Sequence, residues 1–409
     1  MGLHHNLAHR FFCYRAAVRE SATAAYDNLA LDTRLMHSVH LASTHRPTDT
    51  RIFHKECASL REAGHRVTVV APHDRHETIA GVRIHAVAPP ADGKERLTRT
   101  LFRVYRAATT FPKSVVLHVH DAELLPWALL LKLQGYTVVY DMHEDTPRQM
   151  MYQHWIPEVL RPLVAEGMRG LEWLAARWFD ALIVAEPVIG ERFPDAHPVL
   201  VRNFPLRDEL VPSEGQPYQG REALVAYVGT ITRVRGIEEL VSAMGMIRAE
   251  HNAFLDLGGS FHPPELEAQV KRLEGWDRVR YHGWLDRPDV ARILGFCRVG
   301  VVAFHPTERY LGNYPTKLFE YMAAGLPVVV SDFDQLKPFV EQHQCGLMVD
   351  PQDPIAIADA ITWLLKHPEE AEAMGRRGRE AVRTEYNWER EAVKLTSLYD
   401  HLGSRGGTA

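Results

Sequence analysis

The sequence has few cysteines and no long hydrophobic run. The cysteines are Cys13, Cys57, Cys297 and Cys345, and no two of them have a paired spacing. This scatter excludes a disulfide framework or a cysteine-rich zinc module and favours a reducing, cytoplasmic setting. The longest apolar stretch, around residues 127–140, is interrupted by Lys132 and Gln134. It falls short of the roughly 18 uninterrupted apolar residues of a membrane-spanning helix, so we predict no such helix.

Positive charge is not in excess either. The formal net charge is −5, from 47 Lys and Arg residues against 52 Asp and Glu residues, which gives no global basic field for binding nucleic acid. The sequence contains 23 histidines, but no H-E-x-x-H or similar ligand spacing, so we predict no metal site. At ~100–200 residues per domain, a chain of 409 residues that is 46% hydrophobic and 24% charged predicts two to three globular domains.

Residues 1–35 differ from the rest of the chain. The segment "LAHRFFCYRAAVRE" carries Arg10, Arg15 and Arg19 before any acidic residue, and it lacks the apolar core and cleavage site of a signal peptide. One interpretation is an amphipathic helix on a membrane surface. The other is a dispensable N-terminal extension, with the native start at Met36, directly before the strand pattern "HSVHLAST".

Short Val-rich runs alternate with helical stretches along both halves of the chain. The patterns "RVTVVAP", "SVVLHVHD" and "YTVVYDMHE" precede a Pro- and Gly-rich segment at residues 203–222, and "ALVAYVGT", "VGVVAFH" and "PVVVS" follow it. Such alternation predicts parallel sheets covered on both faces, and the unpatterned segment predicts a linker. The predicted fold class is therefore α/β, with two Rossmann-like doubly wound domains at residues 36–202 and 223–384. Ligands of such sheets bind beyond the carboxyl ends of the strands, here in a cleft between the domains.

The sharpest motif is "GNYPTKLFEYMAAGLPVVVS" at residues 312–331. Pro315 lies near a predicted helix start, where its missing N–H costs nothing, and Gly325 lies where a helix ends in a left-handed residue. The free amides and positive dipole of the helix N-terminus, with Lys317 in its first turn, predict an anion site suited to a diphosphate. Glu320, one turn later, is in reach of hydroxyls on a group attached to that phosphate. A capped helix with a solvated lysine and glutamate is the alternative.

This block resembles the donor-binding signature of family-4 retaining glycosyltransferases with the two-domain GT-B fold. The segment "AYVGTITRVRGIEELVSAM" at residues 226–244 resembles the strand–loop–helix that opens the second domain of that family. The segments "RYHGWLDRPDVARIL" and "CGLMVDPQDPIAIADAITWLL" match later family segments in order and spacing. The resemblance covers residues 38–400 and implies that residues 385–402 form a helix that packs back on the first domain.

The resemblance implies that a UDP- or GDP-sugar binds through its diphosphate to the loop after the first strand of the second domain. Arg235 falls where the family usually has a lysine before a glycine, here Gly236. The family's other basic position falls at Thr230, next to Gly229, so Arg233 is the candidate for the second charge. Arginine can bind two phosphate oxygens at once, which makes this replacement chemically reasonable.

Glu320 matches the second of two family glutamates, the one that holds the nucleotide ribose through its hydroxyls. The first of the pair falls eight residues earlier, at Gly312, so the sequence departs from the family pattern. In the family that glutamate contacts the donor sugar. Here the residues of the loop substitute for it, or the sugar is bound differently. The candidates in this loop are Asn313, Tyr314, Pro315 and Thr316.

In the first domain, "VVYDMHED" places His143 just past the carboxyl end of a strand, at the mouth of the cleft. The resemblance implies that His143 contacts the donor sugar near the reacting carbon. Glu144 either orders His143 or binds acceptor hydroxyls. Asp121, after the strand in "HVHD", and Arg51, in "STHRPTDTRIF", are further acceptor-side candidates. An ion pair between Asp49 and Arg51 beside the cleft is the alternative for that loop.

Residues 94–113 have six basic residues against one acidic residue. Their apolar positions recur at roughly helical spacing, at Leu97, Leu101, Phe102 and Tyr105. This pattern predicts either a helix that lies on an anionic membrane surface and presents a lipid-linked acceptor, or a basic solvated face packed against the first domain. Both interpretations stay open.

The leading functional hypothesis is metal-independent, retaining transfer of a hexosyl group to a hydroxyl acceptor. The catalytic candidates are His143, Arg235 and Lys317. The acceptor is a glycan, a lipid-linked saccharide or a small molecule, which suggests polysaccharide biosynthesis in the cytoplasm with a peripheral contact to the inner face of the membrane. We expect no cofactor and no nucleic-acid partner. The alternatives are a non-catalytic nucleotide-sugar-binding partner, favoured by Gly312, and a sugar-nucleotide epimerase or hydrolase.

Overall fold

The computed structural model describes residues 35–153, 156–211, 217–308 and 310–405. The predicted N-terminal extension at residues 1–35 lies outside these residues, apart from its last position. The predicted linker is described except for residues 212–216.

The first domain is built on an eight-stranded sheet with the order β3-β4-β2-β1-β5-β6-β7-β8. All pairings are parallel except that of the edge strand β3, which forms an antiparallel hairpin with β4. The strands are β1 (His37–Leu41), β2 (Arg66–Pro72), β3 (Glu77–Ile79), β4 (Val82–Val87), β5 (Val116–Val119), β6 (Thr137–Met142), β7 (Ala181–Val184) and β8 (Val199–Leu200).

The second domain is built on a six-stranded, wholly parallel sheet with the order β11-β10-β9-β12-β13-β14. Its strands are β9 (Leu224–Val228), β10 (Phe254–Gly258), β11 (Val279–Gly283), β12 (Val299–Val302), β13 (Val328–Ser331) and β14 (Gly346–Val349). The α/β fold class with two parallel-sheet domains is confirmed.

Helices pack on both faces of each sheet, which explains why central strands such as β5 and β12 are buried along their whole length. In the first domain they are η1 (Ile52–Cys57), α2 (Ala58–Glu62), α3 (Gly93–Glu95), η2 (Arg96–Thr100), α4 (Leu101–Ala108), α5 (Leu125–Leu133), α6 (Thr146–Met150), α7 (Arg161–Trp178) and α8 (Pro187–Gly190). In the second domain they are α9 (Ile237–Met246), α10 (Leu266–Val270), α11 (Arg287–Phe296), α12 (Thr316–Ala323), α13 (Lys337–Val340), α14 (Pro354–Lys366) and α15 (Pro368–Thr384).

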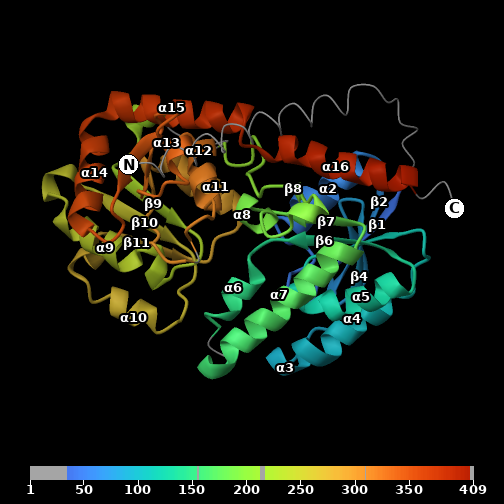
Figure 1. Ribbon diagram of the computed structural model, residues 1–409. Helices are drawn as coiled ribbons and strands as arrows, with labels where there is room; N and C mark the ends of the chain where they lie inside the picture. The colour runs from blue at the N-terminus through green and yellow to red at the C-terminus, as the bar shows by residue number, and fades with distance from the viewer. Residues whose placement is uncertain (1–34, 154–155, 212–216, 309, 406–409) are drawn as a thin grey trace, which may run out of the picture.

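The last helix, α16 (Trp388–Arg405), returns to the first domain. Figure 1 shows α15 over the second domain and α16 continuing along the same side of the molecule onto the first. Trp388 is 1% exposed, and its Nε1 donates a hydrogen bond to Ser59 Oγ at 2.9 Å. Tyr399 is fully buried, and its hydroxyl lies 2.8 Å from Ser38 Oγ on β1. The chain therefore connects the two domains twice.

The basic segment at residues 94–113 packs against the first domain. Leu101 and Val104 of α4 are buried in its core. Phe102 is 47% exposed, and its ring and that of Tyr105 contact Trp127. Among the described residues, none of the helices combines the length and the apolar character needed to cross a membrane.

Candidate functional site

The loop after β9 carries the predicted diphosphate-binding residues. Gly229 and Gly236 have φ angles of +116° and +73°, a left-handed conformation that favours glycine. A Cβ at Gly236 would lie 2.0 Å from the carbonyl oxygen of Ala303, so only glycine fits there. Arg235, just before it, donates from Nε to the Tyr310 hydroxyl at 3.1 Å and from Nη1 to the Thr230 carbonyl at 3.2 Å. These bonds hold the guanidinium between two loops of the second domain.

Lys317 is the second cation of this cluster. It lies in the first turn of α12, is 7% exposed, and its Nζ is 3.5 Å from the centre of the Tyr227 ring. Among the described residues, Nζ has no hydrogen-bond acceptor. Burial, with the charge of Arg235 adding to it, lowers the pKa of Lys317 well below its ordinary value. An anion bound beside it would favour the charged ammonium.

Gly229 makes room for this lysine. A Cβ at position 229 would lie 2.8 Å from Lys317 Cε. Arg235 and Lys317 also share a neighbour, because both cations lie within 6 Å of the Phe304 ring, at 5.5 Å and 5.8 Å. The structure therefore brings Gly229, Arg235 and Lys317 together, as the sequence predicts.

Arg233 does not join this cluster. Its side chain is 58% exposed, and it is bound to Glu238 Oε2 at 2.7 Å and to Gln269 Oε1 at 2.6 Å. The prediction that Arg233 supplies the second charge is therefore not supported by the geometry. The side chain turns toward the first turn of α9 because that turn carries an acidic residue.

Glu320 is held by a cation that the sequence analysis did not select. Its Oε1 accepts a hydrogen bond from Arg287 Nη1 at 2.6 Å. Arg287 also forms a paired contact with Glu209, with both distances at 2.7 Å. Glu209 and Glu320 together raise the pKa of Arg287, although burial opposes this shift. The Glu320 side chain is thereby held in place, where its oxygens can accept hydrogen bonds from hydroxyls.

The loop before α12 explains the departure at Gly312. Gly312 has a φ angle of +97°, so a glutamate at this position would be strained. Pro315 is the N-cap of α12 and Thr316 is its first residue, which confirms the predicted helix start. The backbone amide of Tyr314 donates to Glu186 Oε1 of the first domain at 3.4 Å. Gly312, Asn313 and Tyr314 therefore lie where the two domains meet.

His143 follows β6, at the carboxyl end of the first sheet. Its ring is 16% exposed, and its Nε2 lies 3.1 Å from Asp141 Oδ2 and 3.1 Å from His120 Nδ1. Alternate residues of a strand share a face. Asp141 therefore lies on the same face as His118 of β5, with His143 and His120 just past the ends of the two strands, and His40 of β1 pairs with His118. The strand-end prediction for His143 agrees with this placement.

Arg51 is not an acceptor-side residue. It is 4% exposed, and its guanidinium binds both oxygens of Asp141 at 3.0 Å, Glu56 at 2.9 Å and the Val201 carbonyl at 3.1 Å. The alternative pairing with Asp49 is also wrong, because Asp49 Oδ1 instead accepts from the backbone amide of Arg51 at 2.8 Å. Arg51 is the N-cap residue of η1, and its side chain is directed into the core of the first domain.

Asp121 is likewise buried, at 7% exposure. Its carboxylate accepts from the backbone amide and hydroxyl of Thr44 and contacts His45 Nδ1 at 2.9 Å. The carboxylate of Asp121 is therefore used to order the loop after β1. Hydrogen bonding and charge from Asp121 raise the pKa of His45 to about 8, although burial opposes this.

His45 is a site residue that the sequence analysis missed. Its ring centre lies 5.5 Å from that of His143. The exposed carboxylate of Glu144 contributes to raising the pKa of His45 and also that of Arg235 in the second domain. Glu144 is therefore near enough to cations of both domains to act on each of them electrostatically. The sequence signal that could have identified His45 is its position in the loop between the end of a strand and Arg51.

Two cavities adjoin these residues. One of about 240 Å³ lies at the carboxyl ends of β9 and β10. It is lined by Val228, Gly229, Thr230, Gly258, Gly259, Ser260, Trp284 and Leu285. Only Gly229 and Thr230 were predicted, although "DLGGS" repeats the strand-then-glycine pattern of the β9 loop.

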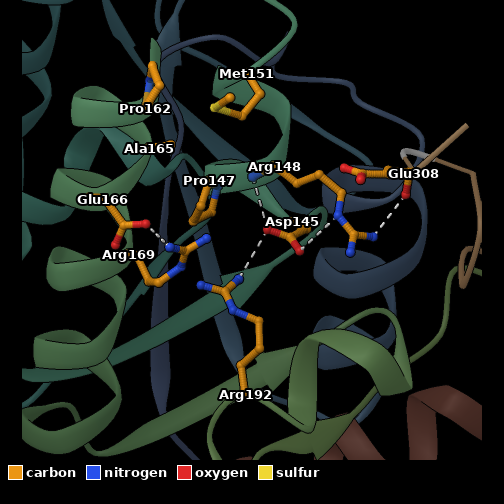
Figure 2. Close-up of a pocket in the computed structure, with 10 residues that line it drawn as sticks. All are labelled: Asp145, Pro147, Arg148, Met151, Pro162, Ala165, Glu166, Arg169, Arg192 and Glu308. Atoms are coloured by element: carbon orange, nitrogen blue, oxygen red, sulfur yellow. Dashed lines mark hydrogen bonds and ion pairs between the residues drawn. The ribbon is translucent and has the colours of Figure 1, made fainter. Parts of the chain in front are cut away.

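The second cavity, of about 540 Å³, lies between α6, α7 and residue 308 of the second domain. Figure 2 shows Arg148 reaching between Asp145 and Glu308, and its Nη1 donates to the Glu308 carbonyl at 2.9 Å. Arg192 contacts Asp145 from the other side at 3.3 Å. Cations, carboxylates and apolar side chains such as Met151 line one space, which suits a polar acceptor with hydroxyl groups.

Metal-ligating side chains gather beneath His143. The two overlapping sets are His40, Glu56, His118 and His120, and Glu56, His120, Asp141 and His143. Burial, reinforced by the charge of Asp141, raises the pKa of Glu56 well above its ordinary value. Protonation of Glu56 is therefore favoured, and Arg51 balances the charge of Asp141. A divalent ion here would lie beside a buried guanidinium, so this cluster fits a metal ion poorly.

Two family models match consecutive parts of the chain. The model described as Glycosyltransferase Family 4 matches residues 50–199, and the model described as Glycosyl transferases group 1 matches residues 213–381. These two ranges correspond to the two domains of the structure.

Curated relatives are identical to this chain at about a quarter of the aligned residues. The phosphatidyl-myo-inositol mannosyltransferase of Mycolicibacterium smegmatis is 26% identical over 365 residues, which cover 85% of this chain and 88% of that protein. An uncharacterized glycosyltransferase of Methanocaldococcus jannaschii is 27% identical over 184 residues, 44% of this chain and 45% of that protein. In this second case the match spans less than half the length of the relative.

Solved structures share the fold. Sucrose-phosphate synthase from Thermosynechococcus elongatus superposes with a TM-score of 0.71 at 22% identity, covering 91% of this chain and 100% of that one. An Anabaena protein in complex with UDP-glucose superposes with a TM-score of 0.65 at 13% identity, covering 90% of this chain and 100% of that one.

Proposed function

Because the chain belongs to the family 4 (group 1) glycosyltransferases with the GT-B fold, we propose that it transfers a hexosyl group from a nucleotide diphosphate sugar to a hydroxyl acceptor with retention of configuration. The observation that carries the proposal is the buried amino group of Lys317, which has no hydrogen-bond acceptor among the described residues. It lies beside Gly229 and near Arg235, where a diphosphate would supply its counter-charge.

Each part of a nucleotide sugar has a matching group in the cleft. The diphosphate binds between Arg235, Lys317 and the amides of the loop after β9. The base occupies the cavity beside Trp284, and the ribose hydroxyls bind Glu320. The sugar reaches across to His143, with Asn313 and Tyr314 on the opposite side. A UDP-sugar is supported by the UDP-glucose complex of the Anabaena structure.

Catalysis then depends on stabilising the leaving diphosphate. As the bond to the sugar lengthens, negative charge develops on the phosphate, and the fixed cations of Arg235 and Lys317 neutralise it without a metal. Preorganised groups of this kind are worth ~3–4 kcal/mol each in a transition state. The leaving phosphate takes the proton of the acceptor hydroxyl on the same face, so the new bond forms on the side that the diphosphate leaves. The acceptor enters through the cavity of Figure 2.

A nucleotide-sugar screen tests the proposal. UDP, GDP and their common hexosyl derivatives are added to the full chain, and thermal stabilisation identifies the donor, because a ligand of the folded state raises the melting temperature. Lys317→Met should abolish that stabilisation. Lys337→Met, a control on α13 whose side chain is 38% exposed, should retain it. The stabilising donor is then tested for transfer to glycan, lipid-linked and small-molecule acceptors.

Donor binding without transfer to any acceptor would instead support the non-catalytic partner, and release of free sugar would support a hydrolase. No stabilisation by any nucleotide would contradict the proposal. A peripheral membrane contact through residues 94–113 stays a prediction, which vesicle co-sedimentation of the full chain would test.

A further inference from the structure

A chain of hydrogen bonds lies directly beneath His143. His143 Nε2 is 3.1 Å from Asp141 Oδ2 and 3.1 Å from His120 Nδ1. His120 Nε2 is in turn 2.8 Å from His40 Nδ1. All these side chains except His143 are buried. Among the described residues, no hydrogen bond reaches the other ring nitrogen of His143, Nδ1.

The carboxylate of Asp141 determines which ring nitrogen carries the hydrogen in each of the three hydrogen-bonded histidines. Burial alone would raise the pKa of Asp141, but the Arg51 guanidinium and His143 hold it well below its ordinary value. An ionised carboxylate only accepts hydrogen bonds, so His143 Nε2 must carry the hydrogen. His120 Nδ1 then faces that hydrogen with a lone pair. The hydrogen of His120 is therefore on Nε2, where it is donated to His40 Nδ1.

We propose that Asp141 is a positioning residue that keeps the hydrogen of the His143 imidazole on Nε2 and leaves Nδ1 as a hydrogen-bond acceptor for the substrate. This inference rests on the proposed function, because it assigns His143 its ligand. A lone pair at Nδ1 accepts from a hydroxyl and is repelled by a phosphate oxygen. His143 therefore binds a hydroxyl of the transferred sugar and leaves the diphosphate to Arg235 and Lys317.

The surrounding rings hold this arrangement in place. His120 stacks on His118 at 4.5 Å between ring centres and on His40 at 5.1 Å. His118 Nδ1 is 2.9 Å from the Tyr399 hydroxyl of α16. Burial lowers the pKa of His118 to about 4 and that of His120 well below its ordinary value. The stacked rings are therefore uncharged near neutral pH. The charge that acts on the tautomer of His143 is then that of the Asp141 carboxylate.

The first test needs no substrate and no activity. In the full chain labelled with ¹⁵N-histidine, the imidazole signals of residue 143 are assigned by their loss in His143→Gln. We expect the nitrogen shifts of a neutral ring with the hydrogen on Nε2, and the same tautomer for His120 and His40. A hydrogen on Nδ1 of His143, or hydrogens on both nitrogens near neutral pH, would overturn the inference.

The second test removes the charged acceptor. In Asp141→Asn the side chain can present either its oxygen or its NH₂ group to His143, because Arg51 Nη2 lies 3.0 Å from both oxygens of the native carboxylate. The hydrogen of His143 is then no longer fixed on Nε2, so Nδ1 meets the sugar hydroxyl as a donor in part of the molecules. We expect a fall in kcat of roughly 100-fold with little change in stabilisation by the nucleoside diphosphate alone. An unchanged kcat in a folded variant would show that Asp141 does not position His143.

Tyr399→Phe is the matched control, because it removes a hydroxyl from the same cluster without touching the bond between Asp141 and His143. It should lower the melting temperature but keep the tautomer and kcat. If Asp141→Asn does not fold, the tautomer of His143 measured in the wild-type protein still tests the inference. Failure to find any donor or acceptor would count against the proposed function and leave the tautomer result standing. A hydrogen on Nδ1 in an active transferase would overturn this inference alone.

Discussion

Arg235 donates a hydrogen bond from Nε to the Tyr310 hydroxyl at 3.1 Å, which joins the loop after β9 to the loop before α12. These two loops provide most of the donor-side candidates, and they are 75 residues apart in the sequence. The bond sets the guanidinium beside Lys317, whereas Arg233, two residues earlier, points toward α9.

The two arginines therefore form a matched pair of variants. Arg235→Ala should lower kcat/KM for transfer by roughly 100-fold or more, because a preorganised cation facing the leaving group is lost. Arg233→Ala should cost little, since its partners are Glu238 and Gln269. Steady-state kinetics of both variants, with melting temperatures as a check on folding, measure the difference. Equal losses would contradict the assignment of Arg235.

Glu320 offers a second test, on donor affinity. Glu320→Ala should raise the KM for the donor by about 10- to 100-fold, because a hydrogen bond to a charged group is worth ~1.5–3 kcal/mol. The fold should survive, since Arg287 keeps both of its bonds to Glu209 at 2.7 Å. A 2′,3′-dideoxy analogue of the nucleotide should bind wild type and variant equally. If the variant discriminates against that analogue as strongly as wild type does, Glu320 does not hold the ribose.

The fold and the donor side were largely predictable from the sequence because they depend on local rules. Val-rich runs, Gly236 and Pro315 specify strands, a left-handed turn and a helix start through their neighbours in the chain. The N-terminal side was predicted less well. Asp121 and Arg51 stand at the predicted strand end and loop, but their directions depend on partners far away in the sequence.

Arg51 illustrates the reason. Its guanidinium bonds to Asp141 across 90 residues, and no spacing in the sequence reports that contact. The same applies to Arg287, which joins Glu209 and Glu320 from an unselected helix start. Ion pairs between distant elements decided which candidates reach the cleft, so the strand-end rule located the site but not its individual side chains.

The pair of His45 and Asp121 predicts a pH dependence of stability. The pKa of His45 is about 8 in the folded chain and about 6.5 in an unfolded one. The folded state therefore holds this proton more tightly, so the stabilisation is complete below about pH 6.5 and is lost as the pH rises through about 8. His45→Gln should lower the melting temperature at about pH 6 and have a much smaller effect at about pH 9. A constant difference across this range would contradict the pairing.

Glu186 predicts a pH effect at the contact between the domains. Burial raises its pKa to about 8, although its Oε1 accepts from the backbone amide of Tyr314 at 3.4 Å. The folded state holds this proton more tightly than the unfolded state does, where the pKa is about 4.3. The stabilisation that comes from binding this proton is fully present below about pH 4 and is lost as the pH rises through about 8.

The variant Glu186→Gln tests this prediction, because it imitates the protonated form, keeps the acceptor for Tyr314 and cannot ionise. Its melting temperature should therefore be close to that of wild type at about pH 4 and higher than wild type at about pH 9. A variant that is destabilised equally at both pH values would show that Glu186 is ionised in the contact between the domains.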